Sequence, residues 1–142
     1  MQVHKHLIVR ANIAIPPSQA DTEAVTEWLN NLIHKIGMKV LMGPYAKYCP
    51  VIGNKGLTAA AIIETSHIVL HSWDECIPAV MQLDVYSCSE FEIGTIINEL
   101  KSFSPIKIEY KFLDRSENLT EISSGELAGD HVVEGYLEPQ HA

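Results

Sequence analysis

The sequence predicts an α+β fold, in which a largely antiparallel sheet carries helices packed on one face as a two-layer protomer. Several β-branched segments follow one another through short connections, which is typical of antiparallel pairing. Two further segments carry apolar residues at helical spacing, and the order of elements reads β-α-β-β-β-β-α-β. The uncovered face of such a sheet needs a partner. A dimer arranged as an αββα sandwich is therefore expected.

The strands are recognised by β-branched residues and by alternation of apolar and polar side chains. They are expected at residues 6–15, 39–42, 57–63, 67–73, 80–87 and 106–112. Between the second and third strands, Tyr45–Gly56 is expected to be a loop, because prolines and glycines lie toward both of its ends.

Each helix has recognisable end signals. Asp21 or Thr22 can cap the first helix, and Gly37 supplies its end. The run Ser89-Glu90-Phe91-Glu92 has the spacing of a capping box, so the second helix is expected to open there. Its helical periodicity predicts burial of Ile93, Ile96, Ile97, Leu100 and Phe103.

The length of 142 residues fits one domain, predicted over residues 1–113, followed by an acidic tail over residues 114–142. From Asp114 onward there are seven acids and one base, Arg115, so the tail carries −6 of the total charge of −8. Scattered glycines add to this pattern. The tail is expected to be solvated or disordered and to carry no chemistry.

Composition also narrows the class of protein. An acidic chain without a basic patch is a poor nucleic-acid binder. No apolar run approaches the roughly 20 residues of a membrane span, and Met1–Lys5 has no signal-peptide core. Cys49, Cys76 and Cys88 have neither metal spacing nor an even disulfide count. A protein of the reducing cytoplasm, without a membrane or nucleic-acid partner, is expected.

The run Glu64–Glu75, followed by Cys88, gathers a hydroxyl, two imidazoles, carboxylates and a thiol around a β-branched stretch. Strand alternation places His67 and His71 on one face and Ser66 on the other. Ser66 and His71 can cooperate only if Ser66 lies where the backbone turns. No carboxylate or cysteine completes a ligand set with the histidines, so no metal site is expected.

This stretch resembles the short prokaryotic class of pyruvoyl-dependent S-adenosylmethionine decarboxylases. The resemblance spans roughly residues 5–113 and is most specific at its centre. It rests on Ser66-His67, His71, Trp73-Asp74-Glu75 and Ser87-Cys88, with flanking matches at His6-Leu7, Tyr45–Pro50 and Gly56-Leu57-Thr58.

The resemblance implies that the chain cleaves itself between Thr65 and Ser66, giving fragments of 65 and 77 residues. Ser66 would then become a pyruvoyl group, the cofactor whose carbonyl withdraws electrons during decarboxylation. The implied substrate is S-adenosylmethionine, and the implied product supplies aminopropyl groups for polyamine (spermidine) synthesis. The implied assembly is a homodimer of processed protomers.

Other roles follow from the same resemblance. His71 would assist proton removal during processing, and Thr58 would steady the ester intermediate. Cys88 would act as the general acid that protonates the product. Glu75 would bind the ribose hydroxyls, and Tyr48 would stack on adenine.

The chain departs from the family pattern at two positions. Thr65 stands where members commonly have Glu, and Arg10 stands where they commonly have an acid in the first strand. Arg10 motivates an alternative, a pyruvoyl-dependent decarboxylase of ornithine or arginine. Thr65 motivates a second alternative, an unprocessed homologue that binds a nucleoside or acts as a regulatory partner.

Overall fold

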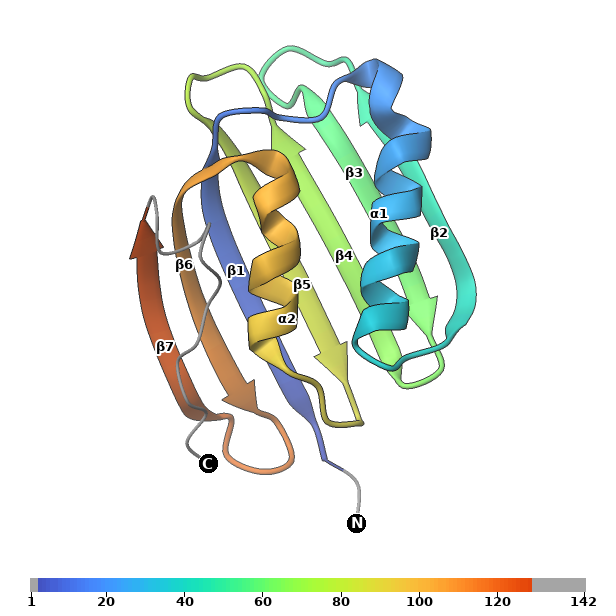
Figure 1. The fold of residues 1–142 in the computed structure, drawn as a ribbon, viewed down its shortest axis with the longest axis vertical. Coiled ribbons are helices and arrows are strands. Elements are labelled where there is room, and N and C mark those ends of the chain that lie inside the picture. The colour runs from blue at the N-terminus through green and yellow to red at the C-terminus, as the bar shows by residue number, and fades with distance from the viewer. Residues whose placement is uncertain (1–2, 129–142) are drawn as a thin grey trace.

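The protein, seen here in a computed structural model that describes residues 3–128, forms one seven-stranded antiparallel sheet with two α-helices on one face (Figure 1). The strand order is β2-β3-β4-β5-β1-β6-β7. The strands are β1 (Lys5–Ile13), β2 (Val40–Cys49), β3 (Gly56–Ile63), β4 (Ser66–Trp73), β5 (Ala79–Ser87), β6 (Pro105–Asp114) and β7 (Thr120–Ala128). The predicted fold class is confirmed.

The helices are α1 (Thr22–Lys35) and α2 (Ile93–Glu99), and a 3₁₀ turn (Leu100–Phe103) extends α2. Both helices cover the same face of the sheet (Figure 1). The five side chains predicted to be buried on the second helix are all buried, namely Ile93, Ile96, Ile97, Leu100 and Phe103. Alternate residues of the central strands complete this core, such as Ile68 and Leu70 of β4. The opposite, uncovered face of the sheet is called the open face below.

Strand β2 corrects one prediction. The segment Tyr45–Cys49 is strand and not loop, and β2 runs through Gly43 and Pro44. Its pairing with β3 shifts register on both sides of Met42. Such irregularities and a proline are tolerated because β2 lies at the edge of the sheet and needs only one partner.

Two further predictions were wrong. No capping box forms at Ser89, because the helix begins at Ile93 after Glu92, whose side chain makes no capping hydrogen bond. Part of the predicted tail is ordered as β7, which pairs with β6 along its length. The rest of the predicted tail, from residue 129, lies outside the described residues.

Gly56, the first residue of β3, cannot carry a side chain. A Cβ atom there would lie 1.8 Å from the carbonyl oxygen of Ser72 on β4, and its φ of +156° is unfavourable for other residues. This close approach fixes the pairing of β3 with β4. Within residues 3–128, no helix is long and apolar enough to cross a membrane.

Candidate active site

The predicted cleavage point lies in the tight turn that joins β3 to β4. Ile63 pairs with Ser66 across this hairpin, so only Glu64 and Thr65 form the connection. Ser66 has a φ of +148°, which is a strained conformation for a residue with a Cβ atom. Ser66 therefore stands where the backbone turns, which is the condition for its hydroxyl to leave the regular strand alternation.

The carbonyl group of Thr65 is held by the neighbouring strand. The backbone N–H of Cys88 donates a 2.8 Å hydrogen bond to this oxygen. The strand register supports the contact, since Ser66 is paired with Ser87, the last residue of β5. The carbonyl that Ser66 would attack is thus already polarised by a fixed donor.

The hydroxyl of Thr65 is also engaged. It accepts a 2.9 Å hydrogen bond from Ser87 Oγ and donates to Met38 Sδ at 3.2 Å. Ser87 Oγ in turn accepts the backbone N–H of Ser89 at 3.0 Å. Ser87 is fully buried.

Thr58 and His71 meet at the other end of the hairpin. Thr58 Oγ1 lies 2.9 Å from His71 Nδ1, and the imidazole stacks on the indole of Trp73 with 5.8 Å between ring centres. His71 follows Ser66 by five residues in the same strand, so their Cα atoms are about 17 Å apart. Within one protomer, the structure does not bring His71 to Ser66.

Tyr48 and Glu75 lie beside the loop between β2 and β3. Tyr48 donates a 2.7 Å hydrogen bond to Asp74 Oδ2, and this bond raises the pKa of the phenol. Both oxygens of Glu75 accept the backbone N–H of Gly53 at 3.0 Å, and one also accepts that of Lys55. These backbone bonds, that of Gly53 first, lower the pKa of Glu75. Each predicted substrate-binding group therefore already has a partner within the chain.

A polar cluster lies on the open face near Ser66. The carboxylate of Asp84 contacts the imidazoles of both His6 and His67. Burial pushes the pKa of Asp84 upward, but the bonds and charges of His6 and His67 outweigh it and leave that pKa below its usual range. The guanidinium of Arg115 lies 3.9 Å from the ring centre of Tyr86 and 3.2 Å from His6 Nδ1. Sequence reasoning counted His6 and His67 among the family matches but gave none of these residues a role, because they come from three strands and the residue after β6.

Arg10 is placed on the open face of β1, in a shallow groove with Glu109 and Glu126. Its guanidinium lies 3.3 Å from Glu109 Oε2 and 3.2 Å from Asn12 Oδ1. The charge of Arg10 is therefore paired with a carboxylate of β6.

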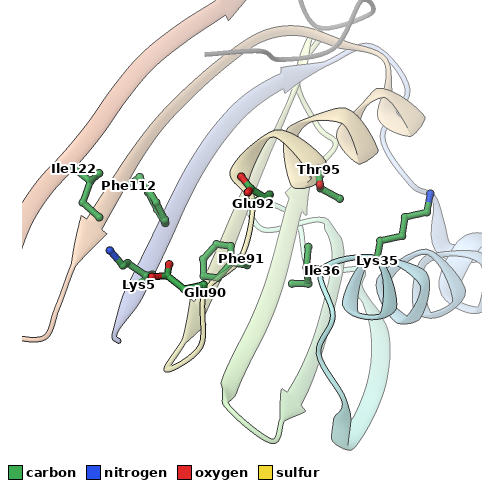
Figure 2. Close-up of a pocket in the computed structure, with 9 residues that line it drawn as sticks. All are labelled: Lys5, Lys35, Ile36, Glu90, Phe91, Glu92, Thr95, Phe112 and Ile122. Atoms are coloured by element: carbon green, nitrogen blue, oxygen red, sulfur yellow. The ribbon is translucent and has the colours of Figure 1, made fainter. Parts of the chain in front are cut away.

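A separate cavity of about 490 Å³ opens on the helix side of the sheet (Figure 2). It lies where the end of α1 and the segment before α2 approach β1 and β6. None of the predicted site residues lines it. Its lining residues are Lys5, Lys35, Ile36, Glu90, Phe91, Glu92, Thr95, Phe112 and Ile122.

The turn at Ser66 lies within a match to a known family, since the family model for S-adenosylmethionine decarboxylase matches residues 5–116. The chain belongs to the S-adenosylmethionine decarboxylase family. That match covers the sheet from β1 to β6, both helices and Arg115, and it ends before β7.

Proteins similar to this chain include one from a bacterium and one from an archaeon. A protein of Clostridium botulinum (strain Langeland), named S-adenosylmethionine decarboxylase proenzyme, is 32% identical over 82 residues, which are 57% of this chain and 66% of that protein. The proenzyme of Methanococcus vannielii is 30% identical over 110 residues, or 76% of this chain and 85% of that protein. The alignment with the Clostridium protein thus spans just under two thirds of its length.

A solved structure of the family shares the fold. The crystal structure of the adenosylmethionine decarboxylase from Aquifex aeolicus superposes with a TM-score of 0.58, covering 78% of this chain and 88% of that one. Sequence identity is 16%, so the likeness concerns the fold alone.

Proposed function

We propose that the protein is a self-processing, pyruvoyl-dependent decarboxylase that converts S-adenosylmethionine to its decarboxylated form and CO₂. The observation that carries this proposal is the geometry of the Thr65–Ser66 peptide. Its carbonyl oxygen accepts a hydrogen bond from the Cys88 N–H, and Ser66 is held at a strained φ of +148°. Membership of the family supports the same activity.

Self-cleavage uses groups that the chain itself provides. The hydroxyl of Ser66 attacks the carbonyl carbon of Thr65, and the negative charge that develops on the carbonyl oxygen is stabilised by the Cys88 N–H. The C–N bond breaks as the nitrogen takes up the proton lost by the Ser66 hydroxyl and becomes an amine, and an ester joins Thr65 to Ser66 Oγ. Loss of the Ser66 α-proton then breaks the Oγ–Cβ bond, releases Thr65 as a carboxylate and leaves a dehydroalanine at residue 66. The imine tautomer of this residue is hydrolysed by water, which releases ammonia and gives the pyruvoyl group.

The pyruvoyl group left at residue 66 supplies an electrophilic carbonyl, which is the electron sink that decarboxylation of an amino acid requires. The surroundings of residue 66 fit such a group, since the peptide there is already bent out of the strand and polar donors line the neighbouring strand end. Cys88 is the proposed acid that returns a proton to the product. Glu75 and Tyr48 are the proposed contacts to ribose and adenine.

The assembly proposed is a homodimer in which the two protomers share each site. The distance of about 17 Å between Ser66 and His71 along β4 is too long for proton transfer within one chain. Both helices lie on one face of the sheet and leave the open face uncovered (Figure 1). A second copy packed against this face brings the Thr58–His71 pair of one chain to the Ser66 turn of the other.

Complementation between two defective chains tests the shared site. Co-expressed with a Ser66→Ala chain, a His71→Ala chain should recover cleavage, since its intact Ser66 meets the partner's intact imidazole. The His71→Ala chain expressed alone should remain uncleaved. Cleavage of the His71→Ala chain to the same extent with and without the Ser66→Ala chain would contradict a shared site.

Release of CO₂ from candidate amino acids tests the substrate. We expect release from S-adenosylmethionine and not from ornithine or arginine, since the charge of Arg10 is paired with Glu109. Activity on either diamine precursor alone would favour the alternative that Arg10 motivates. The proposed place of the reaction is polyamine (spermidine) synthesis in the cytoplasm.

A further inference from the structure

Thr65 is held at two points by two successive residues of the neighbouring strand end. The Cys88 N–H binds its carbonyl oxygen at 2.8 Å, and Ser87 Oγ donates to its hydroxyl at 2.9 Å. The carbonyl oxygen and the hydroxyl of Thr65 are thus both held. The next residue, Ser66, has the strained backbone conformation, at φ +148°.

The contacts of Ser87 form a directed chain. The Ser89 N–H donates to Ser87 Oγ, Ser87 Oγ donates to Thr65 Oγ1, and Thr65 Oγ1 donates to Met38 Sδ. In this arrangement each hydroxyl accepts one hydrogen bond and donates one, and Ser87 Oγ also lies 3.7 Å from Met38 Sδ. Ser87 is buried at 0% exposure, so water cannot replace its bond to Thr65.

We propose that Ser87 is a positioning residue for self-cleavage, acting through the Thr65 hydroxyl to hold the scissile carbonyl against the Cys88 N–H. This inference rests on the proposed self-processing function. Thr65 directly precedes Ser66, and its hydroxyl takes part in this series of hydrogen bonds. Through the hydrogen bond from Ser87, the Thr65 side chain helps to orient the peptide that Ser66 attacks.

The physical basis is orientation. A displacement of the reacting atoms by about 1 Å can slow a reaction about 100-fold. Removing the Ser87 hydroxyl leaves the Thr65 side chain with only its 3.2 Å contact to Met38 Sδ, so the orientation of the scissile peptide depends mainly on the Cys88 N–H. We expect self-cleavage of Ser87→Ala to be at least about tenfold slower.

The test is a time course of intact mass for the full-length chain freshly purified, at a temperature at which each variant is folded. Ser87→Ala and Thr65→Val should both cleave slowly, and the double variant should be no slower than the slower single one. Ser87→Thr, which keeps a hydroxyl, should cleave at nearly the original rate. Additive slowing in the double variant would contradict action of Ser87 through Thr65.

Ser72 offers a matched control. It is also a buried serine (3% exposed), and its hydroxyl bonds the backbone of Leu57 at the other end of β4. Ser72→Ala therefore also removes a buried hydroxyl, but it leaves Thr65 in place. Equal rates of cleavage for Ser87→Ala and Ser72→Ala, both folded, would overturn the proposal.

Hydroxylamine adds a readout that a purely structural role does not predict. It cleaves esters, so it releases fragments from any chain stalled after the attack of Ser66. If Ser87 serves the attack itself, no ester accumulates in Ser87→Ala, and hydroxylamine yields no additional fragments. Release of fragments would place the defect in the elimination and contradict the proposal. If the original chain never cleaves, the proposed function fails too, whereas a cleaving original with an unaffected Ser87→Ala refutes only the role of Ser87.

Discussion

The backbone N–H of Cys88 donates a 2.8 Å hydrogen bond to the carbonyl oxygen of Thr65, and the same residue carries a free, half-buried thiol. One residue thus contributes two groups to the site. The backbone N–H is the group expected to assist cleavage, because it binds the carbonyl oxygen of the peptide that breaks. The side chain is the acid that we propose for the reaction with substrate.

Cys88→Ala separates these two contributions. The variant keeps the N–H, so self-cleavage should proceed within about twofold of the original rate, whereas turnover should fall about 100-fold or more with the loss of a general acid. Intact mass measures the first and CO₂ release the second. Cys49→Ala, which changes another partly buried cysteine, is the control and should alter neither. Unchanged turnover in Cys88→Ala would remove the thiol from the mechanism.

Thr58 orients the imidazole of His71 through the 2.9 Å contact between Oγ1 and Nδ1. Thr58→Val keeps the shape of the side chain but removes the hydroxyl, so self-cleavage should slow about tenfold or more. Thr58→Ser should restore it. A Thr58→Val chain that cleaves as fast as Thr58→Ser would show that the hydroxyl does not serve processing.

Glu75 should hold the loop between β2 and β3. Because its carboxylate accepts the backbone N–H groups of Gly53 and Lys55, Glu75→Ala should speed hydrogen exchange at these two amides. Glu64→Ala, a change of another exposed glutamate in a turn, should not. Unaltered exchange at Gly53 in Glu75→Ala would show that the loop is held by other contacts.

The pKa of Asp84 lies below its unfolded value, since His6 and His67 favour the ionised carboxylate more than burial disfavours it. A depressed acid pKa adds stability above the unfolded value of about 4 and loses it as pH falls through the folded value. Urea unfolding at pH 7 and pH 3 should therefore show a smaller loss in Asp84→Asn than in the original protein. The difference should be about 1 kcal/mol or less, because the carboxylate is partly exposed. Equal losses would mean that the bonds from His6 and His67 do not stabilise the ionised form.

Local pattern predicted the central strands and both helices, because alternation and helical periodicity reflect which side chains are buried. It failed at β2, where pairing with β3 overrides the turn signals of Gly43 and Pro44. It failed at β7 for a related reason. That strand lies at the sheet edge, and its side chains are exposed or half-buried, so no apolar alternation marks it.

In the site, too, local pattern predicted some features, while others depend on how the strands pair. The motif around Ser66 is contiguous in sequence and could be found there. The contact of Thr65 with Ser87 depends on the register of β4 with β5, which no local pattern specifies. The cluster of His6, Asp84 and His67 depends on β1 lying next to β5, which chain order alone does not indicate.

The intact mass of the purified chain, beside that of Ser66→Ala, tests self-processing most directly. The account predicts a 65-residue fragment ending in the Thr65 carboxylate and a 77-residue fragment that reacts with a ketone reagent at its first residue. Ser66→Ala should give one full-length mass. A single full-length mass for the original chain after long incubation, with no ketone-reactive fragment, would contradict the account.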